Sequence, residues 1–407
     1  MFREIRLGFA LLVFLVVSVP ASSAEPKYGP GASNAEIRIG NTMPYSGPAS
    51  AYASTGAAEA AYFRMINDKG GINGRKITFI SYDDAYSPPK TMEQTRRLVE
   101  SDEVLLIFQA LGTPTNTAVQ KYLNQKKVPQ LFVGSGASKW GDPAHFPWTM
   151  GLAPTYWSEG RVFAKHILER YPNGRIAILW QNDDAGKEQL QSVKTGLGER
   201  ADMIVASESY EIVEPTVDSH ITSLKASSAD IMISMSTPKA AAQAIKKVAE
   251  LGWKPTYFQS STSASISAVL RPAGFDNAKG VISAAFMKGY SDPTWKDDPE
   301  MLRWIAFMDK YYPEGSKENG NNVAAHIAAQ VLVEVLRQCG DDLTRENIMK
   351  QAANLHGYRA EMLLPGITIN TGPADYYPIE QLQLIRFDGE RYQPVGSIVD
   401  VSAERRE

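Results

Sequence analysis

Cysteine is almost absent from this sequence, because its 407 residues include only one, Cys339. A single cysteine excludes an intrachain disulfide and a metal site built from several thiolates. Histidine is also scarce, and its five copies are scattered without the HExxH spacing or any other spacing typical of metal ligands. We therefore expect no bound metal.

Motifs for covalent or nucleotide chemistry are missing as well. There is no GxSxG elbow, and the apolar context VLVEVLRQC favours a small core residue at Cys339 over a reactive thiol. Residues 196–201, GLGERA, formally match the dinucleotide fingerprint, but they end a helical pattern instead of following a strand. Gly186-Lys187 lacks the upstream Gly and the following Ser or Thr of a phosphate loop. The sequence predicts neither an enzyme nor a cofactor.

Neither the charge nor the apolar runs of the sequence indicate nucleic acid or a membrane as a partner. The formal net charge is −3 with both signs interspersed, which gives no footprint for nucleic acid or an anionic membrane. Beyond residue 24 no apolar run approaches the roughly 20 residues of a membrane-spanning helix.

The first 24 residues read MFREIRLGFALLVFLVVSVPASSA. Two arginines, an apolar run and small residues in this order are typical of a secretory signal peptide, with cleavage after Ala24. A membrane anchor is the alternative, although the apolar run is short for one. No cysteine lies beside the cleavage point to carry a lipid. We expect a free periplasmic protein.

Short β-branched runs alternate with helical patterns through the first 280 residues or so. The runs include IRIGNTM, KITFISY, VLLIFQ, PQLFVG, RIAILWQ, DIMISMS and PTYFQS. This alternation predicts an α/β protein with parallel sheets and helices on both faces. Ligands of such sheets bind at the carboxyl ends of the strands. Further on, FDGERY predicts an Asp-Gly hairpin between two strands.

Two Asp pairs follow strand patterns, Asp83-Asp84 in KITFISYDDAYSPPK and Asp183-Asp184 in RIAILWQNDDAGKEQ. Paired carboxylates suit acid and base catalysis. The two pairs lie far apart in the sequence, however, and Asp between a strand and a helix commonly caps the helix. We favour capping, and we interpret the shared pattern as two similar lobes that begin near residues 35 and 153.

The stretch FQALGTPTNTAV runs from an apolar strand through Gly112 into a helix, with Thr113 as the expected N-cap and Pro114 in the first turn. A second loop of this kind, LFVGSGASKW with Ser135 and Gly136, follows the next strand. Because successive parallel strands usually lie side by side, both loops should open on one crevice. Neutral donors with Lys139 as the only nearby cation favour a carboxylate over a phosphate. Two ordinary turns without a ligand are the alternative.

These segments in order resemble the periplasmic binding proteins of the branched-chain amino acid ABC transporter class, the leucine-binding type. The resemblance covers nearly all of the mature chain. It is carried by MPYSGPASAYASTGAAEAAYFRMINDKGGINGRKITFISYDDAYSP, by LGTPTN, by VPQLFVGSGAS and by the strand followed by NDDAGK.

The resemblance implies a type I periplasmic binding protein fold, with two doubly wound parallel-sheet lobes joined by a three-segment hinge and closing over a ligand. We assign residues 35–152 and 287–365 to the first lobe, and residues 153–286 and 366–401 to the second. The implied partners are a small-molecule ligand and the membrane permease subunits of an ABC transporter, and we expect a monomer.

The resemblance also marks candidate ligand-binding residues in the first lobe. Tyr45 and Tyr52 follow the first strand, where each is either a pocket wall or a packing residue. The two loops that hold the ligand carboxylate in this class match Leu111, Gly112, Thr113 and Asn116, and Ser135, Gly136, Ala137 and Ser138.

The second lobe departs from the pattern of amino-acid binders, which place an acid after the strand matching PTYFQS to pair with the ligand ammonium. Here the loop contains Gln259 and Ser261 and no acid, and an unpaired buried ammonium would cost several kcal/mol. The match there can slip by a few residues, and Asp183 or Asp184 is a possible substitute.

Smaller side chains at Ala185 and Ser236, where relatives often have aromatic residues, predict a larger cavity. Tyr156 lies where it can stack on a ring. We hypothesise an aromatic or hydroxy-aromatic acid as the ligand.

Three classes of function remain to be compared. A solute-binding protein for ABC uptake leads, with branched-chain or other amino acids or amides as alternative ligands. A ligand-sensing module for a receptor would use the same fold and cleft. An enzyme would need a nucleophile, metal set or cofactor loop, which the sequence lacks.

Overall fold

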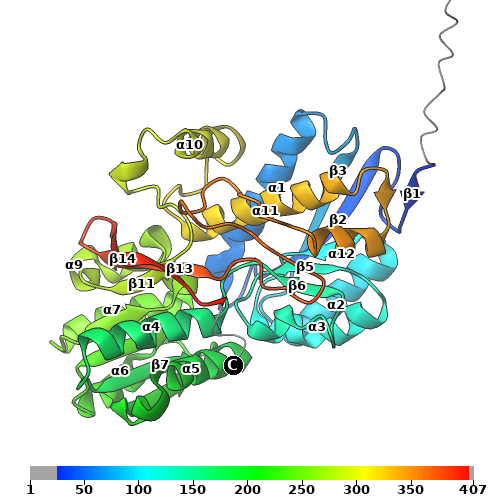
Figure 1. The fold of residues 1–407 in the computed structure, drawn as a ribbon. Coiled ribbons are helices and arrows are strands. Elements are labelled where there is room, and N and C mark those ends of the chain that lie inside the picture. Colours follow the sequence, from blue (N-terminus) through cyan, green and yellow to red (C-terminus); the bar gives the residue numbers. More distant parts are fainter. Residues whose placement is uncertain (1–24, 403–407) are drawn as a thin grey trace, which may run out of the picture.

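The computed structural model of the protein describes residues 25–402. The predicted signal peptide, residues 1–24, lies outside the described residues. Within them the chain forms two α/β lobes, each built on its own sheet (Figure 1).

The first lobe contains a five-stranded, wholly parallel sheet. The strand order is β3 (Lys76–Asp83), β2 (Glu36–Met43), β4 (Leu106–Phe108), β5 (Gln130–Val133) and β6 (Thr149–Gly151). The central strands β4 and β5 are buried along their whole length, as expected for strands covered on both faces.

Helices cover both faces of this sheet. One face packs against α1 (Ala53–Asp68), α10 (Pro299–Tyr311), α11 (Gly320–Gln338) and α12 (Arg345–Ala352), which together form the largest apolar core. The other face packs against α2 (Pro88–Arg96) and α3 (Thr113–Gln125). A two-stranded sheet of β1 (Lys27–Tyr28) and β12 (Asp342–Leu343) lies near the amino-terminal ends of the central strands, where the Arg38 N–H of β2 donates to the Gly31 carbonyl at 2.7 Å.

The second lobe contains a seven-stranded sheet. Its order is β14 (Tyr392–Asp400), β13 (Gln381–Phe387), β11 (Ile282–Ala285), β10 (Thr256–Gln259), β9 (Ile231–Met235), β7 (Ile176–Gln181) and β8 (Ile204–Tyr210). The strands from β11 to β8 pair in parallel, whereas β13 is antiparallel to both of its neighbours. The predicted hairpin at Asp388-Gly389 joins β13 to β14.

Two apolar cores lie on the two faces of this second sheet. One contains α4 (Tyr156–Arg170) and α5 (Asp184–Leu197). The other contains α6 (Asp218–Ala226), α7 (Pro238–Glu250), α8 (Arg271–Ala273) and α9 (Phe275–Ala278). Short helical turns complete the chain: η1 (Ser50–Tyr52), η2 (Arg97–Ser101), η3 (Ser138–Gly141), η4 (Gly198–Met203), η5 (Ser261–Ser263), η6 (Ile266–Leu270) and η7 (Pro293–Trp295).

The chain passes between the lobes three times: after β6, after β11 and before β13. Figure 1 shows the result, in which the yellow and orange helices α11 and α12 return to the blue lobe and the red strands β13 and β14 return to the green lobe. Each lobe is therefore assembled from separate stretches of sequence, and the three crossings form the hinge.

The predicted boundaries of the lobes remain predictions. In one segment, residues 366–380, the packing of the side chains differs from the predicted assignment. Residues 366–380 were assigned to the second lobe, yet Ile367, Ile369 and Ile379 are fully buried in the core of the first lobe. The next strand along the chain, β13, begins at Gln381 and belongs to the second sheet. None of the helices in residues 25–402 has the length and apolarity to cross a membrane.

Candidate functional site

A cavity of about 180 Å³ lies between the two lobes, at the carboxyl ends of the strands of both sheets. The predicted site residues that line it come from both lobes: Tyr52, Leu111, Gly112, Thr113, Ser135, Gly136, Tyr156, Ser236 and Ser261. The two Gly- and hydroxyl-rich loops therefore meet at one place, because β4 and β5 are neighbours in the sheet.

Three hydroxyl groups converge at the first-lobe side of the cavity. Thr113 Oγ1 lies 2.7 Å from Ser135 Oγ and 3.5 Å from the hydroxyl of Tyr156. Ser135 Oγ already accepts hydrogen bonds from Trp140 Nε1 at 3.0 Å and from the Ala137 N–H at 3.2 Å. Its own proton is therefore left to donate to Thr113, to the Tyr156 hydroxyl or to a ligand oxygen. All three hydroxyl-bearing residues are buried.

The start of α3 differs in detail from the expectation. Gly112, not Thr113, is the N-cap, and Thr113 is the first helical residue with no capping bond from its side chain. Gly112 has φ of 101°, and a Cβ there would lie 2.5 Å from the Tyr86 ring, so only Gly fits. Because the backbone turn is made by Gly112, the Thr113 hydroxyl is left to face Ser135.

A buried acid lies at the second-lobe side of the cavity, and it is neither Asp183 nor Asp184, which the sequence offered as possible substitutes. Glu159 on α4 is 5% exposed, and its Oε1 accepts the Ser261 N–H at 2.7 Å. Its Oε2 accepts from the hydroxyls of Ser260 at 3.1 Å and Ser261 at 3.3 Å. Burial raises the pKa of Glu159 from 4.5 to about 7, and these hydrogen bonds oppose the rise. The loop after β10 contains no acid, but Glu159 of α4 lies against this loop and supplies a carboxyl group there.

Tyr86 is a second lining residue that the sequence analysis missed. Ala85 and Tyr86 both have positive φ, 52° and 59°, a costly conformation for residues with a Cβ. Asp83 and Asp84 stabilise this turn by accepting the N–H groups of Ala85 at 3.0 Å and Tyr86 at 2.9 Å. The Asp pair therefore has a structural role, and the strained turn places the Tyr86 ring in the cavity.

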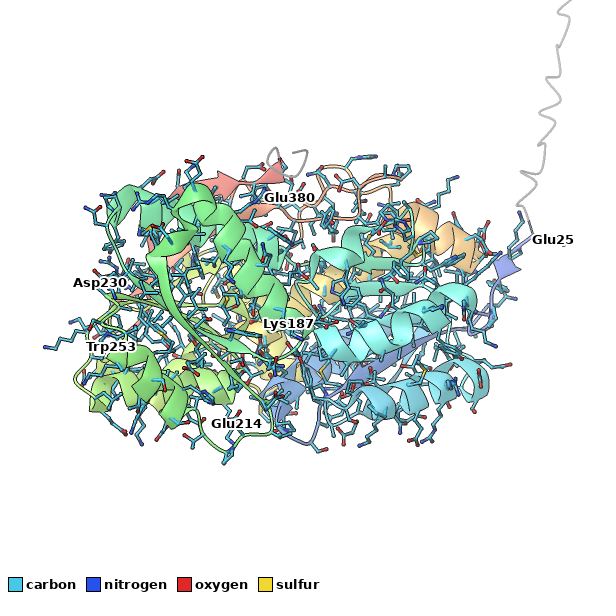
Figure 2. The ribbon with its side chains drawn as sticks, turned by 90° about the horizontal axis from the view of Figure 1, so that it is seen from below. Glu25, Lys187, Glu214, Asp230, Trp253 and Glu380 are labelled. Atoms are coloured by element: carbon cyan, nitrogen blue, oxygen red, sulfur yellow. The ribbon has the colours of Figure 1, made fainter. Side chains whose placement is uncertain are left out.

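The two residues of the second pair, Asp183 and Asp184, have different roles. Asp183 caps α5 by accepting the Gly186 N–H at 3.1 Å, as the capping interpretation predicts. Asp184 pairs with Lys139 of the first lobe at 2.9 Å and accepts from Thr117 at 3.3 Å. Figure 2, seen from below, labels Lys187 of α5 where this helix meets the cyan helices of the first lobe.

The remaining lining residues are mostly amides, apolar groups and hydroxyls that carried no recognisable motif. Polar members from both lobes are Thr55, Gln109, Gln181, Gln189, Thr237, Thr262 and Asn321, and apolar members include Met235, Phe286, Met287 and Ile327. The one sequence signal for Gln109 and Gln181 is their position at the end of a buried strand pattern, where ligand contacts of parallel sheets cluster.

Six predicted site residues do not line the cavity. Tyr45 is 38% exposed and its hydroxyl lies 2.6 Å from Ser81 Oγ. Asn116 turns its amide back to the carbonyls of Ala110 and Gly112, both at 2.7 Å. The other four are held as follows: Ala137 in a small apolar core, Ser138 by its N–H to Glu188 Oε1 at 2.7 Å, Asp184 by Lys139, and Gln259 by the Ser234 carbonyl and Ser263.

Cys339 and the His, Asp and Glu side chains of the described residues are the remaining groups of chemical interest, and Cys339 does not line the cavity. Across residues 25–402 there is no group of three or more His, Cys, Asp or Glu side chains that could hold a metal ion. Cys339 lies in the core of the first lobe, and burial raises the pKa of its thiol to about 12. A thiol with so high a pKa is a poor nucleophile.

The chain belongs to the periplasmic binding protein family, whose model matches residues 36–391. Leu/Ile/Val-binding protein homolog 7 of Brucella abortus (strain 2308) is 24% identical over 338 residues, which is 79% of this chain and 82% of that relative. These findings confirm the resemblance to the leucine-binding class.

Solved structures confirm the type I fold. A branched chain amino acid ABC transporter protein from Thermus thermophilus with bound valine has a TM-score of 0.83 at 17% identity, with 91% of this chain and 98% of that chain covered. A solute binding protein from Rhodopseudomonas palustris BisB5 in complex with 3,4-dihydroxy benzoic acid has a TM-score of 0.75 at 17% identity, with 90% and 97% covered. At these identities the likeness concerns the fold alone.

Proposed function

We propose that this chain is the periplasmic solute-binding component of an ABC uptake transporter and captures a small carboxylate-bearing ligand, with an aromatic or hydroxy-aromatic acid as the best candidate. The lobes close over the ligand, and the membrane permease subunits receive the closed form. Contacts across the cleft, such as Lys139 with Asp184 at 2.9 Å, support a closed arrangement.

The observation that carries the proposal is the outward-directed hydroxyl of Ser135. Two N–H groups occupy the acceptor positions of its oxygen, so its proton is available to an anion beside Thr113 and Tyr156. A charge-assisted hydrogen bond to a carboxylate oxygen is stronger than a neutral one. Thr113 and Ser135, whose hydroxyl oxygens lie 2.7 Å apart, then act as one cradle.

The charge of the cavity favours a singly charged acid. Among the described residues that line it there is no Lys, Arg or His, and Glu159 is the only acid. A phosphate would need cationic partners that this cavity does not provide. A monocarboxylate needs only a few neutral donors, which the cradle supplies.

The walls suit a ring that carries a hydroxyl. Tyr52, Tyr86 and Tyr156 lie on the first-lobe side and near the hinge, and their faces can stack on an aromatic body. On the second-lobe side, Ser236, Thr237 and Thr262 offer hydroxyls to a polar substituent of the ring. Ala185 leaves the space that a larger side chain would fill.

An amino acid is the second candidate ligand, and Glu159 is the observation that favours it. As a carboxylate, Glu159 would pair with an ammonium group, and an ammonium would in turn lower the pKa of Glu159. As a protonated acid, it would instead donate a hydrogen bond to a ligand hydroxyl. The two ligand classes therefore predict opposite protonation states for the same side chain.

Isothermal titration calorimetry of the mature protein, unfolded and refolded to remove carried-over ligand, separates these candidates. Hydroxybenzoates, cinnamates, leucine and valine are titrated into the wild type and Glu159→Gln. Tight binding of an aromatic acid that survives Glu159→Gln supports the first candidate. Tight leucine binding that is lost in Glu159→Gln supports the second. No response to any acid contradicts the proposed ligand class.

A further inference from the structure

A second cavity of about 170 Å³ adjoins the ligand cavity. The two share five lining residues, so they are separated by one thin partition: Ser261, Ala284, Ala285, Met287 and Asn321. The second cavity is distinct in its other walls, which come from β13, β14, the segment after β11 and the start of α11.

The second cavity also lies between the lobes. At its rim, Arg271 of the second lobe pairs with Glu318 of the first lobe at 2.6 Å. Close by, Ser265 Oγ donates to Asn319 Oδ1 at 3.2 Å, again across the lobes. Closure of the lobes therefore encloses both cavities, and a ligand that fills both would contact both lobes over a longer distance.

The partition contains little that could resist a ligand. Ala284 and Ala285 have no side chain beyond Cβ, and Met287 is an unbranched, adaptable side chain. The Met287 methyl group lies beside the backbone of α11, 3.3 Å from the position of a Cβ on Gly320. The Asn321 side-chain nitrogen is buried and has no hydrogen-bond partner among the described residues. A ligand that passes between the two spaces would have to displace the Met287 side chain.

The lining of the second cavity suits an apolar group and not a second charge. Ile266, Val323 and Ile385 contribute apolar surface. Lys288, which also lines it, is already paired with Asp298 at 2.8 Å and Glu300 at 2.9 Å, so it has no charge to spare for an anion. Lys317 lines the cavity as well and is paired with Asp309. A second ligand carboxylate would therefore find both lysines already paired and would meet the lining acids Asp292 and Glu318.

We infer that the two cavities form one elongated site for a monocarboxylate whose apolar body extends from the Thr113 and Ser135 cradle, past Ala285 and Met287, into the second cavity. This inference rests on the proposed function and names the ligand class more closely. It favours an arylalkyl acid, in which methylene groups separate the ring from the carboxylate, over a benzoic acid, and it favours a monocarboxylate over a dicarboxylate.

A chain-length series tests the inference. Benzoate, phenylacetate, phenylpropionate, phenylbutyrate and phenylvalerate are titrated by calorimetry into the refolded wild type. Each methylene that becomes fully buried should tighten binding by roughly three- to fourfold. A phenylvalerate with a second carboxylate on its ring should bind more weakly than phenylvalerate itself.

Three variants locate the effect. Ile385→Trp fills the second cavity from β13, and Pro394→Trp fills it from an exposed position on β14, which keeps the test available if the first variant unfolds. Val399→Trp is the matched control, since Val399 is partly buried on β14 against the core of its own lobe and lines neither cavity. Both blocking variants should lose the gain with chain length while benzoate affinity stays at the wild-type value, and the control should lose nothing.

The possible outcomes distinguish failure of the elongated site from failure of the proposed function. Benzoate binding without any gain along the series overturns the elongated site and leaves the proposed function standing. If affinity still rises with ligand length in both blocking variants, the alkyl chain of the ligand lies outside the second cavity, and this result also overturns the elongated site. No binding of any acid in the series removes the proposed ligand class, and the elongated site falls with it.

Discussion

Lys139 of the first lobe and Asp184 of the second lobe form an ion pair of 2.9 Å at the mouth of the ligand cleft. The Lys139 hydrogen bond is the largest cause of the lowered pKa of the Asp184 carboxyl. The pair exists only when the lobes meet, so it contributes to the closed state and not to either lobe alone. A ligand that favours closure therefore gains from it through the population of the closed state.

The first prediction concerns this pair. Asp184→Asn should weaken ligand binding by less than about 1 kcal/mol, because both side chains are partly exposed and solvent screens their attraction. The variant should also lose part of the salt dependence of affinity. Titrations at low and high ionic strength measure both effects. Asp218→Asn, which breaks a Lys247 pair within the second lobe, is the control and should change neither.

The second prediction concerns the carboxylate cradle. Ser135→Ala removes a donor to the ligand and leaves the Trp140 indole N–H without its acceptor, so affinity for an acid should fall by about 1 to 3 kcal/mol. Thr113→Val should have an effect of similar size. Calorimetric affinities of the two variants are compared with Thr222→Ala, a hydroxyl on α6 that bonds only within its own helix. Unchanged affinity in both cradle variants would rule out the assigned role.

Much of the fold could be predicted because its signal is local. Buried runs such as LIF in β4 and QLFV in β5 identify parallel strands, and their succession in the sequence matches their adjacency in the sheet. The same adjacency brings the hydroxyls of Thr113 and Ser135, which the sequence places on one crevice, to 2.7 Å of each other.

The rest of the site depends on contacts that no local pattern encodes. Glu159 and Ser261 are 102 residues apart, and in the sequence Glu159 looks like an ordinary acid in the first turn of a helix. Asn116 is the opposite case, because its place in the loop suggested ligand contact but it does not line the cavity. Its amide instead satisfies backbone carbonyls and the Gln130 side chain behind the loop. In both cases the direction of the side chain, which the sequence does not reveal, determines whether the residue reaches the cavity.

The third prediction follows from the buried acid. The pKa of Glu159 is about 7 in the folded protein and 4.5 as its ordinary value. Between these pH values the folded state holds a proton that the unfolded state has lost, so stability should fall as pH rises through this window. The linked loss is roughly 3 kcal/mol at most.

Thermal unfolding of the ligand-free protein at pH values below, within and above the window measures this effect. Glu159→Gln is neutral at every pH and can still accept the Ser261 N–H, so its stability should vary less with pH than that of the wild type. Parallel pH profiles for the two proteins would show that Glu159 does not carry the raised pKa.

The last prediction tests how large a ligand the cleft accepts. Ala185 is 9% exposed, lines the ligand cavity and belongs to a small apolar core with Tyr156 and Trp140. Ala185→Phe should exclude a ring-sized ligand, because the new side chain fills the space between the second lobe and Tyr156. Overpacking should cost about 1 to 3 kcal/mol of stability at most. Ala185→Ser, nearly equal in volume to the wild type, is the control and should keep both affinity and melting temperature. If Ala185→Phe folds and still binds aromatic acids with wild-type affinity, the ring does not lie beside α5, and the space left by Ala185 has no part in ligand selection.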